Sequence, residues 1–214
     1  MLRAILFILI VNLLHLPTIG QEASFFEGTL TLKKTTLSDT SFAIITVKGK
    51  KIRFDELDNN KKLKKYTIID INIPELYAFN VQRKLYTLLP IHPWTNKNKD
   101  EIKVIKSENY KEIYGYKCLQ WRVQNLTKNI EVTYWVVPEG FPFFYKMMKL
   151  LNINENTSNF FLKIPDAQNA FPMLAVERTL LREWKSEIEV INIDKHPVNN
   201  SIFKVPNDFA FFEK

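Results

Sequence analysis

Hydrophobic and polar residues alternate with a period of two along residues 114–137, which read YGYKCLQWRVQNLTKNIEVTYWVV. The apolar positions of one parity are Leu119, Trp121 and Val123 in the first half and Ile130, Val132, Tyr134 and Val136 in the second. This period is typical of strands with one buried face, and the polar residues 124–129 between the halves have turn chemistry. We therefore predict a long antiparallel hairpin. Because a lone hairpin is marginal in water, further strands or a helix must complete its apolar face.

The same alternation predicts strands before the hairpin. They are expected at residues 26–33, 41–48, 52–56, 66–71, 76–80 and 84–89, with extended structure resuming at 101–106. Lys48-Gly49 suits a tight turn between two of them, because Gly tolerates positive φ. Two prolines within residues 90–94 take the chain out of the sheet, since Pro cannot donate to a central ladder.

After the hairpin the period changes to that of a helix. Residues 141–151 (FPFFYKMMKLL) predict a short, strongly apolar helix with Pro142 in its first turn, where proline is tolerated. Its apolar residues are Phe143, Phe144, Met147, Met148, Leu150 and Leu151, with Tyr145, Lys146 and Lys149 outward. Residues 174–188 fit either an amphipathic helix or two strands broken near Lys185-Ser186. The β-branched residues that follow favour strands.

The N-terminus predicts a secretory signal peptide. Met1-Leu2-Arg3 is a short positive region, residues 4–14 are an apolar core, and Thr18 and Gly20 are small residues ahead of a cut near Gln21. A membrane anchor needs roughly 20 apolar residues, and this core has about half of that. We expect one domain at residues 21–214, soluble after cleavage and either periplasmic or secreted.

The formal net charge is +7, and the lysines gather in three runs, at residues 33–34, 48–51 and 61–65. They fit solvated hairpin tips at strand ends or peripheral contact with an anionic membrane surface. No nucleic-acid motif is present, so nucleic acid is not expected as a partner. Cys118 is the only cysteine. Its place among strand residues predicts a small buried hydrophobe.

Nothing in the sequence indicates catalysis, a cofactor or a metal. Beyond residue 20 the only histidines are His92 and His196, each beside a proline and far apart in the chain. The chain lacks G-x-S-x-G, H-E-x-x-H and a phosphate-binding glycine loop. We therefore expect that the protein is not an enzyme.

Five short motifs carry a resemblance to a known family. They are F-x-G-x-L (26–30), VKGKKIRF (47–54), GYKC (115–118), TYWV (133–136) and SIFKVPNDF (201–209). The chain resembles a family of exported bacterial proteins of unknown function, which is similar to the outer-membrane lipoprotein carriers and receptors, LolA and LolB. The resemblance implies a mainly β (α+β) fold: one strongly curved antiparallel sheet, an unclosed barrel, with one or two short helices covering its concave face and an apolar cavity between. In the carriers the cavity holds acyl chains and an arginine takes part, which implies a role for Arg53.

Two functions follow. In the first, the protein shelters a lipid, an acyl chain, a lipoprotein or another apolar ligand between sheet and helix. The candidate residues are Trp94, Trp121, Phe143, Phe144, Met147 and Met148 as walls and Arg53 near a headgroup. In the second, it is an envelope scaffold with a solid core that docks a protein partner. A cavity of several hundred Å³ would favour the first.

Overall fold

The computed structural model describes residues 26–96 and 101–213. Its strands are β1 (Gly28–Thr36), β2 (Thr40–Lys48), β3 (Lys51–Leu57), β4 (Leu63–Asp70), β5 (Glu75–Asn80), β6 (Leu85–Leu88), β7 (Ile102–Ile113), β8 (Tyr116–Asn125), β9 (Ile130–Val137), β10 (Phe171–Thr179), β11 (Trp184–Asp194) and β12 (Ala210–Phe211). Its helices are α1 (Pro142–Leu151), α2 (Asn156–Phe161) and a 3-10 helix, η1 (Asn200–Phe203). The predicted signal peptide lies outside the described residues.

All twelve strands belong to one sheet, in the order β12-β6-β5-β4-β3-β2-β1-β11-β10-β9-β8-β7. The sheet consists of two meanders, β1 to β6 and β7 to β11, which join where β1 pairs antiparallel with β11. The predicted single antiparallel sheet is confirmed in all but one pair, because β12 pairs with β6 in parallel. No pairing joins β7 to β12 in the described part of the chain, so the sheet is not closed into a barrel.

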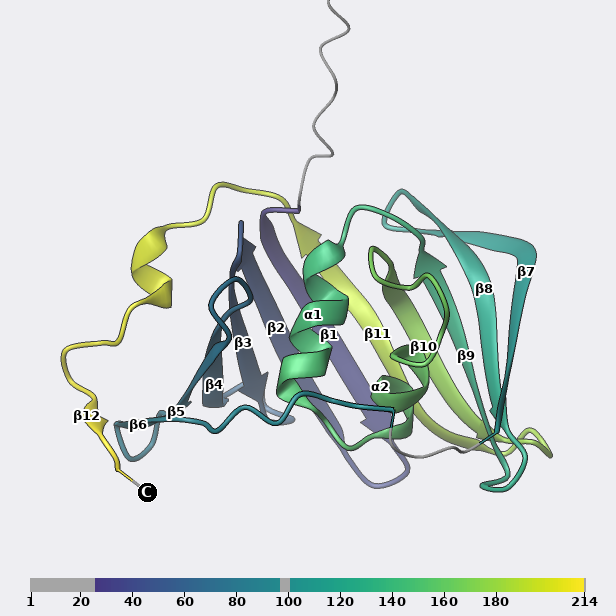
Figure 1. Cartoon of the computed structure of the whole chain (residues 1–214), viewed down its shortest axis with the longest axis horizontal. Coiled ribbons are helices and arrows are strands. Elements are labelled where there is room, and N and C mark those ends of the chain that lie inside the picture. Colours follow the sequence, from purple (N-terminus) through teal and green to yellow (C-terminus); the bar gives the residue numbers. More distant parts are fainter. Residues whose placement is uncertain (1–25, 97–100, 214) are drawn as a thin grey trace, which may run out of the picture.

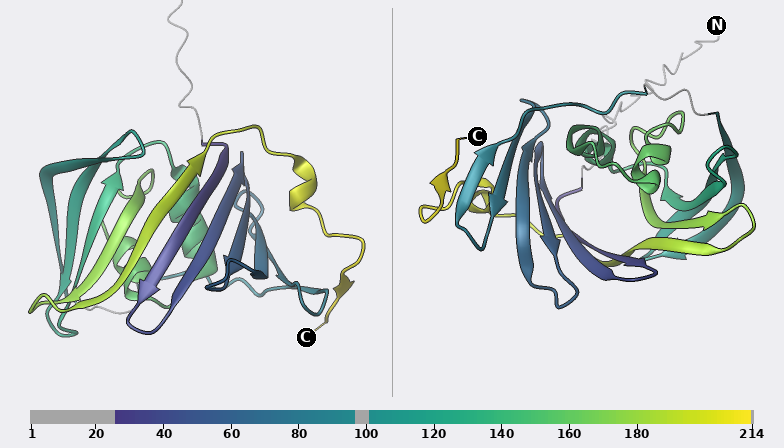
Figure 2. Two further views of the ribbon diagram at one scale, coloured as in Figure 1. Left: turned by 180° about the vertical axis from the view of Figure 1, so that it is seen from behind. Right: turned by 90° about the horizontal axis from the view of Figure 1, so that it is seen from below.

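The sheet is strongly curved, and both α-helices lie on its concave side (Figure 1). Figure 2, in the view from below, shows the strands bent around α1 and α2. The predicted arrangement, an unclosed curved sheet with short helices over its hollow face, is therefore confirmed. Among the described residues, no helix is long and apolar enough to cross a membrane.

The central hairpin is confirmed as β8 and β9. Residues 174–188, which fitted either a helix or two strands, form parts of the strands β10 and β11, as the β-branched residues after them favoured. Their connection spans residues 180–183, ahead of the predicted break at Lys185-Ser186. Glu183 N–H donates to Thr179 Oγ1 at 3.1 Å, and Arg182 adopts a left-handed φ of 74°. The turn thus forms where a threonine hydroxyl stabilises it, and β11 begins at Trp184.

One helix, α2, was not expected from the sequence. It has only six residues, and Asn156, Thr157 and Ser158 in its first turn are poor helix formers. Its formation depends on tertiary packing, since Thr157, Ser158, Phe160 and Phe161 are all buried. A helix of this length leaves no periodic signal that could be read from the chain.

The two ends of the concave side differ. Near the start of α1, the rings of Phe26, Phe141, Phe143 and Phe171 pack with centroids 5.0 to 6.5 Å apart. Gly28 lies beside them with φ at +138°, and a Cβ there would be 2.1 Å from the Asp194 carbonyl oxygen. Only glycine allows β1 to approach β11 this closely. Aromatic side chains therefore fill this end.

The convex face carries a second, smaller core beneath the C-terminal segment. It contains Tyr66, Ile68 and Phe79 from the sheet together with Val198 and Phe203 from the segment after β11. The Tyr66 and Phe79 rings stack at 4.4 Å, and the segment ends by adding β12 to the edge strand β6. This packing covers the convex face of β3 to β6, so these strands are stabilised without using their concave face, which can line a site.

Candidate ligand-binding site

A cavity of about 730 Å³ lies between the concave face of the sheet and the two helices. This volume falls within the range of about 300–1,000 Å³ that is usual for small-molecule sites. The sheet side includes Leu32, Ala43, Ile45, Phe54, Thr67, Ala78, Thr87 and Leu89, and the opposite side includes Tyr134, Phe144, Met147, Met148, Leu151, Ile153, Thr157, Ser158 and Phe161. The lining is thus mainly apolar, with a few hydroxyl groups.

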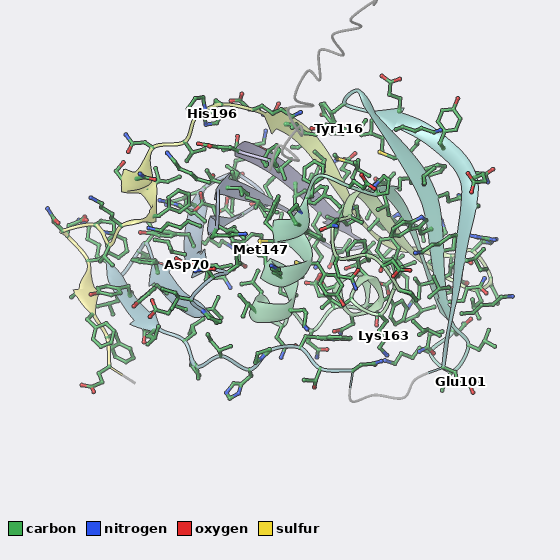
Figure 3. All side chains as sticks on the ribbon, turned by 45° about the horizontal axis from the view of Figure 1, so that its top comes forward. Asp70, Glu101, Tyr116, Met147, Lys163 and His196 are labelled. Carbon is green, nitrogen blue, oxygen red and sulfur yellow. The ribbon has the colours of Figure 1, made fainter. Side chains whose placement is uncertain are left out.

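Helix α1 forms the first wall. Its spacing places Phe144, Met147 and Met148 on the buried side, and all three line the cavity. Figure 3 shows Met147 on α1, over the concave face of the sheet. Pro142 begins the helix, and Asn152 ends it with a left-handed φ of 46° while its N–H donates to the Met148 carbonyl. Because methionine side chains are unbranched and polarizable, this wall can adapt to the shape of a ligand.

Tyr134 of β9 and helix α2 form the second wall. The fully buried Tyr134 hydroxyl donates to the Thr157 carbonyl at 2.7 Å, and its ring meets Phe161 edge-on at 5.5 Å. Burial raises the pKa of Tyr134 well above its usual 10, so the phenol stays protonated and keeps this hydrogen bond. The bond fixes α2 against the sheet.

The third wall is the sheet itself, and its small side chains explain why space remains there. The register pairs Ile45 with Phe54, Phe54 with Thr67 and Thr67 with Ala78, so these residues form one row across β2 to β5. Ala43 lies on the same face of β2, two residues before Ile45. By contrast, Trp121 of β8 packs in the core and does not line the cavity. The cavity therefore lies beside the small residues Ala43, Thr67 and Ala78 of β2, β4 and β5.

The structure brings three of the seven predicted site residues together at the cavity, namely Phe144, Met147 and Met148. Phe143 faces the aromatic cluster at the filled end instead. Trp121 is buried in the core, and the exposed Lys106 places its Nζ 4.5 Å from the centroid of the Trp121 ring. Trp94 follows the sheet-leaving prolines; its indole N–H donates to Asn159 Oδ1 at 3.0 Å and its backbone N–H to the Lys149 carbonyl. Phe143, Trp121 and Trp94 are not part of the cavity lining.

Arg53 lies on the other side of the sheet. Its Nε donates to Asp55 Oδ1 at 2.7 Å, and its guanidinium carbon lies 3.9 Å from the centroid of the Tyr66 ring in the convex core. Burial raises the pKa of the Asp55 carboxyl, and the ion pair with Arg53 partly offsets this. Alternation along β3 explains the placement, because Phe54 and Glu56 face the cavity and Arg53 has the opposite parity.

Sequence reasoning missed the sheet wall and the charged rim of the site. Ala43, Thr67 and Ala78 carried a usable signal, because they are small residues at positions whose strand parity faces the interior. Lys34 and Arg83, which also line the cavity, carried no such signal, because their place at the same end of the site depends on how the strands are aligned. Among the described residues, no three His, Cys, Asp or Glu side chains gather where they could hold a metal ion.

Residues 26–209 match the family model described as Domain of unknown function (DUF4412). This range contains the whole sheet except β12. The chain belongs to this family. No curated protein matches the chain.

Several solved structures are similar to this one. An uncharacterized conserved protein from Thermus thermophilus is 8% identical, with a TM-score of 0.51 over 90% of this chain and 93% of that chain. A structure of PNGF-II is 12% identical, with a TM-score of 0.43 over 86% of this chain and 31% of that chain. A DUF1329 family protein from Desulfovibrio piger is 8% identical, with a TM-score of 0.34 over 85% of this chain and 91% of that chain. At these identities the likeness to the Thermus protein concerns the fold alone, and the other two carry no argument.

Proposed function

We propose that this protein binds a lipid or another apolar ligand in the cavity between its sheet and α1, without a chemical step. The observation that carries the proposal is the apolar lining of a cavity of about 730 Å³. A protein with a purely structural role gains no stability from such a space, because interiors normally pack as densely as organic crystals. An unfilled interior of this size is therefore better explained by an occupant.

Burial of apolar surface supplies the binding energy. Each methylene transferred from water to the cavity contributes about 0.8 kcal/mol, and a cavity formed in advance avoids the cost of opening one. Phe144, Met147 and Leu151 on the helix face Ile45 and Phe54 on the sheet, so an alkyl chain between them would contact apolar atoms on both sides. We expect affinity to rise with chain length until the cavity is full.

The alternative function, a scaffold with a solid core, requires a filled interior. The cavity favours the ligand-binding function over this alternative. The resemblance to the lipoprotein carriers and receptors supports the same choice. We place the protein outside the cytoplasm, in the periplasm or the surrounding medium, on the strength of the N-terminal sequence pattern.

Binding of N-phenyl-1-naphthylamine, a neutral dye that fluoresces in apolar surroundings, tests the proposal. Two variants on adjacent residues of β2 provide a matched pair: Ala43→Phe places a ring in the cavity, and Ile44→Phe places one on the opposite face. The wild-type protein and Ile44→Phe should bind the dye, and added palmitate should displace it. Ala43→Phe should bind the dye at least tenfold more weakly. Absence of dye binding to the wild type, or equal binding by both variants, would contradict the proposal.

A further inference from the structure

The cavity is apolar in its depth and charged at one end. Its charged lining residues are Lys34, Glu56, Lys65, Arg83 and Glu155. The strand register places the sheet residues of this set at the same end of adjacent strands. Glu56 of β3 pairs with Lys65 of β4, Lys65 pairs with Asn80 of β5, and Arg83 lies in the turn after Asn80. Two residues deeper into the cavity on the same face of each strand, the lining residues are Phe54, Thr67 and Ala78. A ligand in this site would therefore meet charges only at the opening.

Both carboxylates of this rim already have lysine partners. Lys34 Nζ lies 2.6 Å from Glu155 Oε1 and so links β1 to the residue that precedes α2. Lys65 Nζ lies 3.1 Å from Glu56 Oε1 on the neighbouring strand. The exposed Arg83 guanidinium makes no ion pair within the described residues. Three cations and two anions leave one positive charge at the opening, and that charge is on the arginine.

Arginine is the side chain best suited to hold an anionic head. Its planar guanidinium donates two parallel hydrogen bonds to a carboxylate or a phosphate, which a lysine cannot do. A hydrogen bond fixes the Arg83 backbone at the end of the cavity, because the Arg83 N–H donates to Asn80 Oδ1 at 2.9 Å in the turn between β5 and β6. A cationic head at the same place would face an unpaired positive charge.

We propose that the ligand is an anionic amphiphile, with its alkyl chain in the cavity and its carboxylate or phosphate head at Arg83. Lys65, which lines the same end of the cavity, is paired with Glu56, and we expect it to contribute less than Arg83. This inference rests on the proposed function and adds the polarity and orientation of the ligand. The head remains at the opening, where water and the rim lysines share its solvation, so no charge is buried without a partner.

Displacement of N-phenyl-1-naphthylamine by four ligands with sixteen carbon atoms each tests the inference. These are palmitate, palmityl phosphate, palmityl alcohol and palmitylamine. The anionic ligands should displace the dye at concentrations about tenfold lower than the alcohol and the amine, which is the effect of one charge-assisted interaction of about 1.4 kcal/mol. A preference confined to palmitate would assign a carboxylate head, and one confined to palmityl phosphate would assign a phosphate head.

Substitutions of single charged residues test whether Arg83 is the source of the preference for anionic ligands. Arg83→Gln should raise the concentration of anionic ligand needed by about tenfold and leave that of the alcohol unchanged. Lys51→Gln, which removes an exposed positive charge at the opposite end of β3, is the control and should change neither value. Because Arg83 is exposed and makes no ion pair within the described residues, its replacement should not affect folding. Lys65→Gln should give a smaller loss in the same direction.

Two negative results have different meanings. If the alcohol and the anionic ligands displace the dye equally, or if Arg83→Gln weakens all four ligands alike, the anionic head is refuted and apolar binding stands. If the neutral dye itself does not bind, the proposed function fails and this inference fails with it.

Discussion

The stability of the variant Ala78→Leu should show whether the space over β5 is a hollow site or a filled core. Ala78 lies in the middle of β5, on the concave face, and pairs with Thr67 of β4 and Thr87 of β6. All three residues line the cavity. A larger side chain at position 78 would therefore extend into open space and meet the wall formed by α1.

The expected change in the free energy of unfolding follows from the carbon atoms that the substitution adds. Leucine adds three carbon atoms to alanine, and their transfer from water to an apolar surface contributes about 2.4 kcal/mol at about 0.8 kcal/mol each. Ordering the leucine side chain costs about 0.5–1 kcal/mol. We expect Ala78→Leu to stabilise the protein by about 1–2 kcal/mol. In a filled core the same addition would cost about 1–3 kcal/mol through overpacking.

Urea unfolding of the ligand-free protein measures the difference, provided that the slope with urea concentration is unchanged. Ala170→Leu is the matched control, because Ala170 is completely buried in the main core and does not line the cavity. Its midpoint should fall, whereas that of Ala78→Leu should rise and dye binding should weaken. A fall of similar size in both variants would mean that side chains already fill the space over β5, and so would contradict a hollow site.

Three further predictions concern other parts of the fold. Gly28→Ala should cost at least about 1–3 kcal/mol in urea unfolding, because φ is +138° and the added Cβ meets the Asp194 carbonyl, while Thr29→Ala should cost less. Burial raises the pKa of the Cys118 thiol from 9.0 to about 11, so the folded state keeps a proton that the unfolded chain loses. Stability should therefore fall as the pH rises from 9 to about 11, by up to about 1.4 kcal/mol per pH unit, and Cys118→Ala should lack this component when the two unfolding series are compared. Phe203→Ala should cost about 3 kcal/mol by opening the convex core and yet leave dye affinity unchanged; a parallel loss of binding would show that the two cores are coupled.

Strands could be predicted because apolar and polar residues alternate along segments such as residues 116–125, where burial also alternates. In β9 this alternation of residue types predicts the strand even though seven of its eight residues are buried, on both faces of the sheet. The hairpin around residue 126 and the small glycine turn at Gly49 are local features and were found. The short helix α2 and the two-residue strand β12 were not, since both depend on packing against segments far away in the chain. The pairing of β1 with β11 is of the same kind, because no local pattern specifies it.

The site was predicted only in part, for a related reason. Helical spacing identified Phe144, Met147 and Met148, because one face of a single element carries them. Trp121 was predicted as a wall of the site, but its side chain packs in the core and does not line the cavity. The periodicity of β8 shows that Trp121 is buried, but it does not show whether the space beside it is filled. The rim formed by Lys34 and Arg83 depends on the alignment of strands, which only the three-dimensional structure gives.

Native mass spectrometry of the protein purified from its own host would show whether the cavity holds a ligand. We expect a population heavier than the polypeptide by the mass of an amphiphile, which is released on collisional activation and reduced in the Ala78→Leu variant. A wild-type protein that carries only its polypeptide mass, and that takes up neither palmitate nor a neutral dye when these are added, would contradict the proposed function.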